Sequence, residues 1–158
     1  MKRLAMLVSV LAVMVMAVPG PLRGQNDPRA GTWKLSLAKS KYTPGPPPSS
    51  ETRTYEIQGH AMKVSIDSID AKGNQVSLRY TAGDDGKDYP LTGLGFADAI
   101  AVKRVNADTF VMDTKKGGKV IGTSKGAISK DGKVLTVTSE TTMADGTAVH
   151  NVAVYEKQ

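Results

Sequence analysis

The sequence predicts an all-β protein, a closed antiparallel up-and-down β-barrel of about 8 to 10 strands. Short segments in which apolar and polar residues alternate follow one another from residue 31 to the end, as in half-buried strands. Asp-Gly, a strong hairpin signal, occurs three times between β-rich flanks, at 85–86, 131–132 and 145–146. After the first 30 residues, no window of 11 to 18 residues has a helical period, which argues against an α/β fold.

The first predicted strand, residues 31–37, contains the only tryptophan of the chain. Its apolar residues Trp33, Leu35 and Leu37 alternate with polar ones, so a period of two places them on one face. A buried indole removes about 150 to 250 Å² from water, a large share of the core in a chain with few aromatic residues. We therefore expect Trp33 to fill the base of the barrel.

The residues before this strand resemble a secretory signal peptide. Lys2 and Arg3 precede an uncharged apolar run, residues 4–18, that is shorter than the roughly 20 residues of a membrane-spanning helix. The prediction is a signal peptide at 1–18, cleaved near Ala17, Gly20 or Gly24, and an extended lead-in at 19–30. It implies export to the periplasm or the extracellular space, and a retained membrane anchor is the alternative.

The segment that follows the first strand, residues 38–50, is rich in proline. Four prolines in this segment fix the backbone φ angle and remove amide donors, which excludes a helix interior or a central strand. We expect a polyproline II crossover across one end of the fold. A docking motif for a proline-binding domain is the alternative.

The remaining chain, within a single domain at 31–158, reads as a series of strands joined by tight turns. Pro90 limits one of them to an edge or bulged strand. Closing such a meander removes its two exposed edges, which favours a barrel over a β-sandwich, and one Trp and two Phe are too few for the aromatic girdles of a transmembrane barrel. The predicted strands are 52–58, 62–66, 76–80, 88–92, 99–104, 109–114, 120–128, 134–138 and 149–155.

Composition excludes several classes of function. The formal charge is +6, but the lysines are scattered and no arginine-rich run with interleaved aromatics suggests a nucleic-acid surface. Cysteine is absent, so neither a disulfide nor a thiolate metal site can form. The two histidines, His60 and His150, lack metal-ligand spacing, and no catalytic or cofactor motif is present. We expect a non-enzymatic protein without cofactor or metal.

Both ends of the chain resemble a known family. The opening Gly31-Thr-Trp-Lys-Leu35 resembles the first strand of the lipocalin and fatty-acid-binding-protein group, the calycins, and the closing segments 146–149 and 155–157 resemble the last strand of cellular fatty-acid-binding proteins. The resemblance implies a barrel that receives an apolar ligand, with Trp33 at its base. Cellular fatty-acid-binding proteins carry a helical lid after the first strand, where this chain has the proline-rich residues 43–50. They also carry an arginine that binds the ligand carboxylate two residues before the final tyrosine, where this chain has Ala153.

Strand parity offers two other arginines. Arg53 is in phase with Tyr55, and Arg104 is in phase with apolar residues of its own strand, so both can point inward. A buried guanidinium requires either an internal acid, such as Asp98, or an anionic ligand. The alternative is that either arginine lies beyond the end of its strand and reaches solvent. Tyrosines from three strands could add hydroxyl groups, and the alternative for each is packing in the core. The candidate ligand-binding residues are Arg53, Tyr55, Tyr80, Arg104 and Tyr155.

The functional hypothesis from the sequence is a monomeric exported barrel that binds an apolar or amphipathic, lipid-like small molecule in its interior. No nucleic acid and no stable membrane insertion after signal cleavage are expected. The alternative is a cell-envelope interaction or structural module with a filled barrel. An enzyme that uses Tyr, Arg and His inside the barrel is a third, less favoured hypothesis.

Overall fold

The computed structural model describes residues 27–143 and 145–158. The predicted signal peptide and all but the last residues of the lead-in lie outside them. The described part consists of strands, with one short 3-10 helix, η1, at Leu37–Lys39. The strands are β1 (Gly31–Leu35), β2 (Lys41–Thr43), β3 (Ser50–Gln58), β4 (Ala61–Ile69), β5 (Gln75–Gly83), β6 (Asp85–Thr92), β7 (Ala99–Arg104), β8 (Thr109–Lys116), β9 (Lys119–Ile128), β10 (Val134–Thr142) and β11 (Ala148–Lys157).

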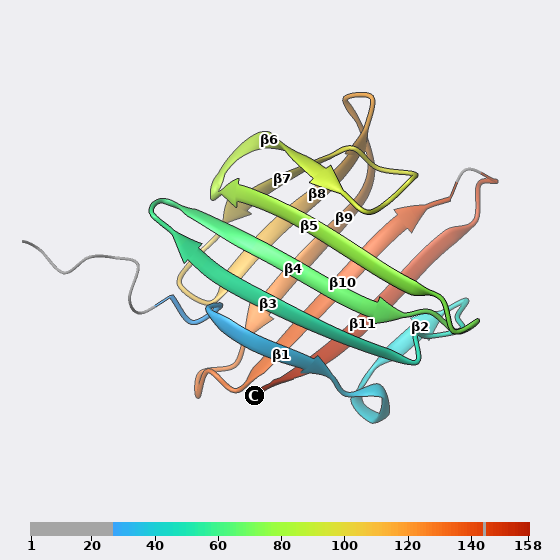
Figure 1. Cartoon of the computed structure of the whole chain (residues 1–158), viewed down its shortest axis with the longest axis horizontal. Helices are drawn as coiled ribbons and strands as arrows, with labels where there is room; N and C mark the ends of the chain where they lie inside the picture. The colour runs from blue at the N-terminus through green and yellow to red at the C-terminus, as the bar shows by residue number, and fades with distance from the viewer. Residues whose placement is uncertain (1–26, 144) are drawn as a thin grey trace, which may run out of the picture.

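The strands close into a barrel. In the described residues, every strand from β3 to β11 pairs antiparallel with the next, and β1 joins the two ends by pairing with both β3 and β11. These ten strands form the ring, and β2 adds three residue pairs to the free edge of β11. The prediction of a closed antiparallel barrel is therefore confirmed. In Figure 1 the strands β1, β3, β4 and β5 cross in front of β8 to β11, so the barrel is flattened into two crossing layers.

The ring is weakest between β5 and β6. Only two residue pairs, Arg79 with Thr92 and Tyr80 with Leu91, join these strands, whereas nine join β4 to β5. Strand β6 contains Pro90, which lacks an amide donor, and a register shift between Asp85 and Asp88. The bulged strand that Pro90 predicts is thus present, with its register shift in the pairing of β6 with β7.

The connections divide the barrel into two ends. We call the end that carries residues 27–30 and the turns β3–β4, β5–β6, β7–β8 and β9–β10 the base. The opposite end, which we call the rim, carries the crossover from β1 to β3 and the connections β4–β5, β6–β7, β8–β9 and β10–β11. In Figure 1 the base is on the left and the rim connections are on the right and at the top.

The interior is packed tightly near the base. Trp33 is completely buried, and Gly126 lets the ring of Phe110 approach the backbone so closely that a Cβ atom there would lie 2.2 Å from it. Toward the rim, positions in phase with these core residues are only half-buried, so solvent reaches the upper interior. The half-buried inward positions include Ser68, Val76, Thr114, Ser124, Ser139, Thr141 and Asn151.

Helices contribute little to the described part of the chain. None of them is long or apolar enough to span a bilayer.

Candidate functional site

A polar cluster lies inside the barrel above the packed base. Glu51 and Arg53 occupy alternate positions of β3 and therefore share a face, and Tyr155 reaches the same place from β11. The Arg53 Nε donates a hydrogen bond to Glu51 Oε1 over 2.6 Å, and the Tyr155 hydroxyl donates to the same oxygen over 2.6 Å. The Arg53 guanidinium also lies over the Tyr155 ring, 4.5 Å from its centre. Three side chains thus hold one another in a fixed geometry.

The charge of Arg53 is well supported. Burial disfavours the charged form, but the neighbouring Tyr155 and Glu51 outweigh it and hold the pKa of Arg53 well above its usual value. The side chain is 15% exposed, and its Nη atoms, which are not sealed from solvent, donate no hydrogen bond to any residue in 27–143 or 145–158. The two terminal NH2 groups of this charged side chain therefore have no partner among the described residues and can bind an acceptor.

The tyrosines around this cluster are neutral hydrogen-bonding groups. Burial raises the pKa of Tyr155 well above 10, and the nearby Glu51 carboxylate adds to the shift. Burial, together with Glu51, also raises the pKa of Tyr42 to about 12. At neutral pH these side chains therefore offer hydroxyl groups, and the guanidinium of Arg53 contacts the ring of Tyr155.

A second pair of tyrosines lies lower in the barrel. Tyr55 on β3 and Tyr80 on β5 flank Val64 across neighbouring strands and line a cavity of about 10 Å³. This volume is about that of one water molecule by the same measure. The Tyr55 hydroxyl is buried without a hydrogen-bond partner in the described structure, and it is the only side-chain atom there of which this holds.

The two inward tyrosines should respond differently to loss of the hydroxyl. Tyr155→Phe removes the hydrogen bond to Glu51 and should lower the free energy of unfolding by about 1 to 3 kcal/mol, since a charged acceptor loses its donor. Tyr55→Phe removes an unpartnered hydroxyl and should leave stability unchanged or raise it by about 1 kcal/mol. Urea denaturation measures both, and equal losses would contradict this assignment of partners.

Arg104 belongs to a different cluster, at the base. Its Nη1 lies 2.8 Å from Asp27 Oδ2, and its remaining donors bind backbone carbonyls of the β7–β8 turn. Asp27 also binds Arg29, which in turn pairs with Asp84 through hydrogen bonds of 2.7 and 2.6 Å. The acid partner of Arg104 is therefore Asp27 and not Asp98, which instead lies near Lys116.

These four residues form a mutually neutralising network, which we call the base network. Burial disfavours ionisation of Asp27, but hydrogen bonds from Arg29 and Arg104 outweigh it and lower its pKa from 3.8 to about 2. Arg29 is only 5% exposed, and its carbonyl accepts a hydrogen bond of 2.8 Å from Trp33 Nε1. The network therefore closes the base and connects the N-terminal segment to the core.

The pKa of Asp27 predicts a loss of stability in acid. Because this pKa is lower in the folded protein than in the unfolded chain, the carboxylate stabilises the fold fully above about pH 4, and this is lost as the pH falls toward 2. The expected contribution is about 2 kcal/mol. Denaturation curves recorded across this range measure it. Asp27→Asn should remove this part of the pH dependence, and an unchanged slope in that variant would assign it to other groups.

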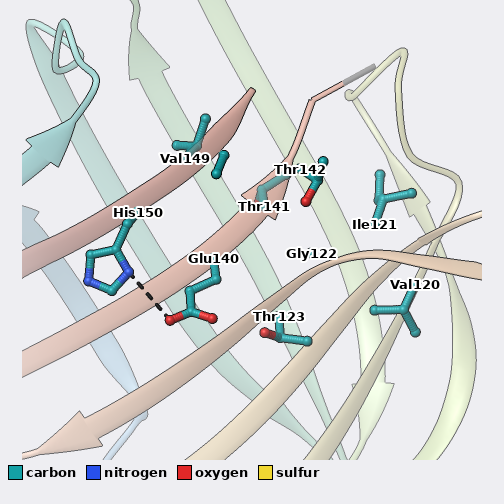
Figure 2. Close-up of a pocket in the computed structure, with 10 residues that line it drawn as sticks. Val120, Ile121, Gly122, Thr123, Glu140, Thr141, Thr142, Val149 and His150 are labelled. Atoms are coloured by element: carbon teal, nitrogen blue, oxygen red, sulfur yellow. Dashed lines mark ion pairs between the residues drawn. The ribbon is translucent and has the colours of Figure 1, made fainter. Parts of the chain in front are cut away.

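Two surface depressions lie elsewhere. One, of about 500 Å³, is open to solvent between the rim ends of β9, β10 and β11, where His150 and Glu140 point toward one another at 3.5 Å (Figure 2). A second, of about 490 Å³, crosses β8, β9 and β10. The side chains of His150 and Glu140 are both more than half exposed. His60 lies in the β3–β4 turn at the base. The two histidines thus share no site, and the interior cluster is the better candidate.

The structure brings together two of the five residues that the sequence suggested, Arg53 and Tyr155. Tyr80 lies beside Tyr55 deeper in the barrel, and Arg104 is in the base network. The sequence interpretation missed Glu51, although its position two residues before Arg53 places it in phase. It also missed Tyr42, Arg29, Asp27 and Asp84, which carry no local signal of their roles.

The ring of ten antiparallel strands, with Gly31-Thr-Trp33 on its first member, is the closed barrel that the resemblance predicted. No family model and no curated protein matches the chain. Solved structures similar to it include zebrafish ileal bile acid-binding protein in complex with cholic acid, at 15% identity, 83% of this chain, 99% of that chain and a TM-score of 0.49.

Two other similar structures are more distant in shape. A de novo designed fluorescence-activating β-barrel is 15% identical over 84% of this chain and 98% of its own, with a TM-score of 0.41. The siderocalin Ex-FABP is 14% identical over 83% of this chain and 74% of its own, with a TM-score of 0.34. The fold assignment rests on the strand pairing and not on these likenesses.

Proposed function

We propose that this protein binds a small amphipathic molecule with an acidic head group in the upper interior of its barrel, and that the head group binds Arg53. The observation that carries the proposal is the largely buried guanidinium whose two terminal nitrogens have no partner among the described residues. A carboxylate can accept both N–H groups in a bidentate arrangement, which gives strong and directional binding.

The surroundings of Arg53 suit an apolar tail. Arg53 is directly opposite Ile66 on β4, and Ile66 is directly opposite Leu78 on β5, so the three are neighbours in one row of paired residues. Both apolar side chains are half-buried and pack against the core cluster. A tail that covers them would remove this apolar surface from water and add affinity in proportion to its area.

Glu51 sets the strength of the proposed site. Its carboxylate already accepts from Arg53 and Tyr155, so an incoming acid binds a guanidinium whose charge is partly neutralised. Coulomb attraction therefore contributes less to the binding free energy than it would at a free cation. The directed hydrogen bonds from the N–H groups contribute a correspondingly larger share. This arrangement favours ligands that also bury an apolar part.

Replacing Arg53 tests the proposal. Arg53→Gln should weaken binding of dodecanoate about tenfold or more, since charge-assisted hydrogen bonds are lost, and should leave dodecanol binding nearly unchanged. Displacement of a naphthalene sulfonate dye measures the affinity for dodecanoate, and displacement of Nile red measures the affinity for dodecanol. Arg79→Gln is the matched control, because Arg79 lies on the outer face of β5 and pairs with exposed Asp67.

A second variant protects this test from misfolding. The double variant Glu51→Gln with Arg53→Gln leaves no unpaired charge at this cluster, so it should fold. It should discriminate only weakly between dodecanoate and dodecanol. Glu51→Gln alone should raise the affinity for dodecanoate, because the guanidinium loses its competing carboxylate. Equal affinity for acid and alcohol in the unaltered protein would contradict the role of Arg53. Failure to bind any probe would favour the filled-barrel alternative.

The same proposal places the protein outside the cytoplasm and treats it as a monomer. The export part is supported by Lys2 and Arg3 followed by the apolar run at 4–18, a pattern typical of secretory leaders.

A further inference from the structure

The two facing walls of the upper interior differ in chemistry. Strands β4 and β5 contribute Ile66, Val76 and Leu78, which are half-buried and in phase with the core residues of these strands. We call these three side chains the apolar wall. Because the barrel is flattened, with β3, β4 and β5 in front of β8 to β11 in Figure 1, the apolar wall faces the opposite layer of strands across the interior.

The opposite layer presents hydroxyl groups at the same height above the packed base. Ser124 on β9 is directly opposite Ser139 on β10, and in the next row toward the rim Gly122 is directly opposite both neighbours that carry hydroxyls. All are half-buried inward positions. We call the four residues the hydroxyl wall: Thr114, Ser124, Ser139 and Thr141.

The hydroxyl wall points into the interior and has no partners there. A Cβ atom on Gly122 would lie 2.6 Å from Thr141 Oγ1, and one on Gly126, in phase with it, would meet the core ring of Phe110. Thr141 and Phe110 therefore project from the same face of the sheet. Within 27–143 and 145–158, none of the four hydroxyls bonds another residue, and none is sealed from the open interior. They can donate to, and accept from, a molecule that occupies the interior.

The two walls together specify a kind of ligand. A body that is apolar on all sides would displace water from the hydroxyl wall without replacing its hydrogen bonds, which lowers affinity. A body with hydroxyl groups on one side and hydrocarbon on the other satisfies both walls. We propose that the acid bound at Arg53 is a long-chain carboxylic acid hydroxylated along one side. This inference rests on the proposed function and names the ligand class of that site.

Strand β11 indicates where the ligand hydroxyls lie. Tyr155 contacts Arg53, and Asn151 on the same strand is directly opposite Ser139. Residues 151 and 155 of an extended strand are about 13 Å apart. The ligand hydroxyls therefore lie near the middle of the chain and not beside the carboxylate.

Paired acids test the ligand class with the full chain. The probes are octadecanoate and a dihydroxyoctadecanoate with neighbouring hydroxyls at mid-chain, each measured by displacement of the naphthalene sulfonate dye. The dihydroxy acid should bind at least as tightly as octadecanoate, or at most about threefold more weakly, because its hydroxyls exchange water for the hydroxyl wall. An apolar interior would reject it about tenfold or more, since the hydroxyls would lose water without gaining partners. Such rejection would overturn the proposal.

Removing two facing hydroxyls identifies the wall. Ser124→Ala with Ser139→Ala should weaken binding of the dihydroxy acid about tenfold and leave octadecanoate binding unchanged or tighter. The matched control is Thr123→Val with Thr138→Val, which removes hydroxyls from the outer side of the same two strands and should change neither affinity. Equal weakening of both acids by the serine variant would assign the serines to the structure of the barrel and would also overturn the proposal.

The outcomes separate this inference from the proposed function. If octadecanoate binds and Arg53→Gln weakens it, while the dihydroxy acid is rejected, the site at Arg53 stands and the hydroxylated ligand class is wrong. If neither acid binds, both the site and the ligand class are wrong.

Discussion

Replacing Arg29 by methionine should lower the free energy of unfolding by about 3 to 5 kcal/mol, because it removes the cation that bridges two buried or half-buried carboxylates and leaves Arg104 alone to neutralise them. Arg29 is 5% exposed and donates to both oxygens of Asp27 and both oxygens of Asp84. Its guanidinium also lies 5.5 Å from the centre of the Phe110 ring. Chemical denaturation followed by tryptophan fluorescence measures the loss, since Trp33 is retained.

Two further variants identify the cause. Arg79→Met breaks an exposed pair with Asp67 and should cost less than about 1 kcal/mol. Combining Arg29→Met with Asp27→Asn and Asp84→Asn removes both carboxylates and leaves Arg104, whose side chain is 31% exposed, as the remaining charge of the network. It should recover much of the loss, because the buried ions are replaced by neutral groups and the remaining charge reaches solvent. A triple variant as unstable as Arg29→Met would show that the arginine acts through packing instead of charge.

The strands could be predicted from the sequence because their signals are local. Alternation of apolar and polar residues over 134–138 and the Asp131-Gly132 turn before it specify a hairpin without knowledge of distant residues. Gly132 indeed adopts a φ of 70° at this turn. The same reasoning placed Arg53, Tyr55 and Tyr155 on inward faces, and closure followed from the need to cover two edges.

The remaining features depend on contacts between distant residues. Arg29 meets Asp84 across 55 positions, and Arg104 meets Asp27 across 77, so no short pattern marks the base network. Glu51 was missed because the predicted strand began at residue 52, one position after it, whereas β3 begins at Ser50. The small strand β2 forms only because β11 is long enough to pair with it beyond the end of β1.

Replacing Trp33 by alanine should also lower the free energy of unfolding by about 3 to 5 kcal/mol, the range for truncating a fully buried aromatic. Trp33 has no exposed surface, and Lys157 lies over its ring with Nζ 5.0 Å from the centre. Since the variant lacks tryptophan, circular dichroism should follow its unfolding. Phe96→Ala at the rim, where the ring is 54% exposed, is the control and should change stability by less than about 0.5 kcal/mol.

Trp33→Phe separates the two contributions of the indole. It keeps an aromatic ring at the base but removes the donor to the Arg29 carbonyl, so it should cost about 1 to 3 kcal/mol, less than alanine. Because that carbonyl belongs to the residue that bridges the two carboxylates, Trp33→Phe combined with Arg29→Met should cost less than the sum of the two single variants. Strict additivity would mean that the indole and the base network stabilise the barrel independently, and that Trp33 acts only by filling space.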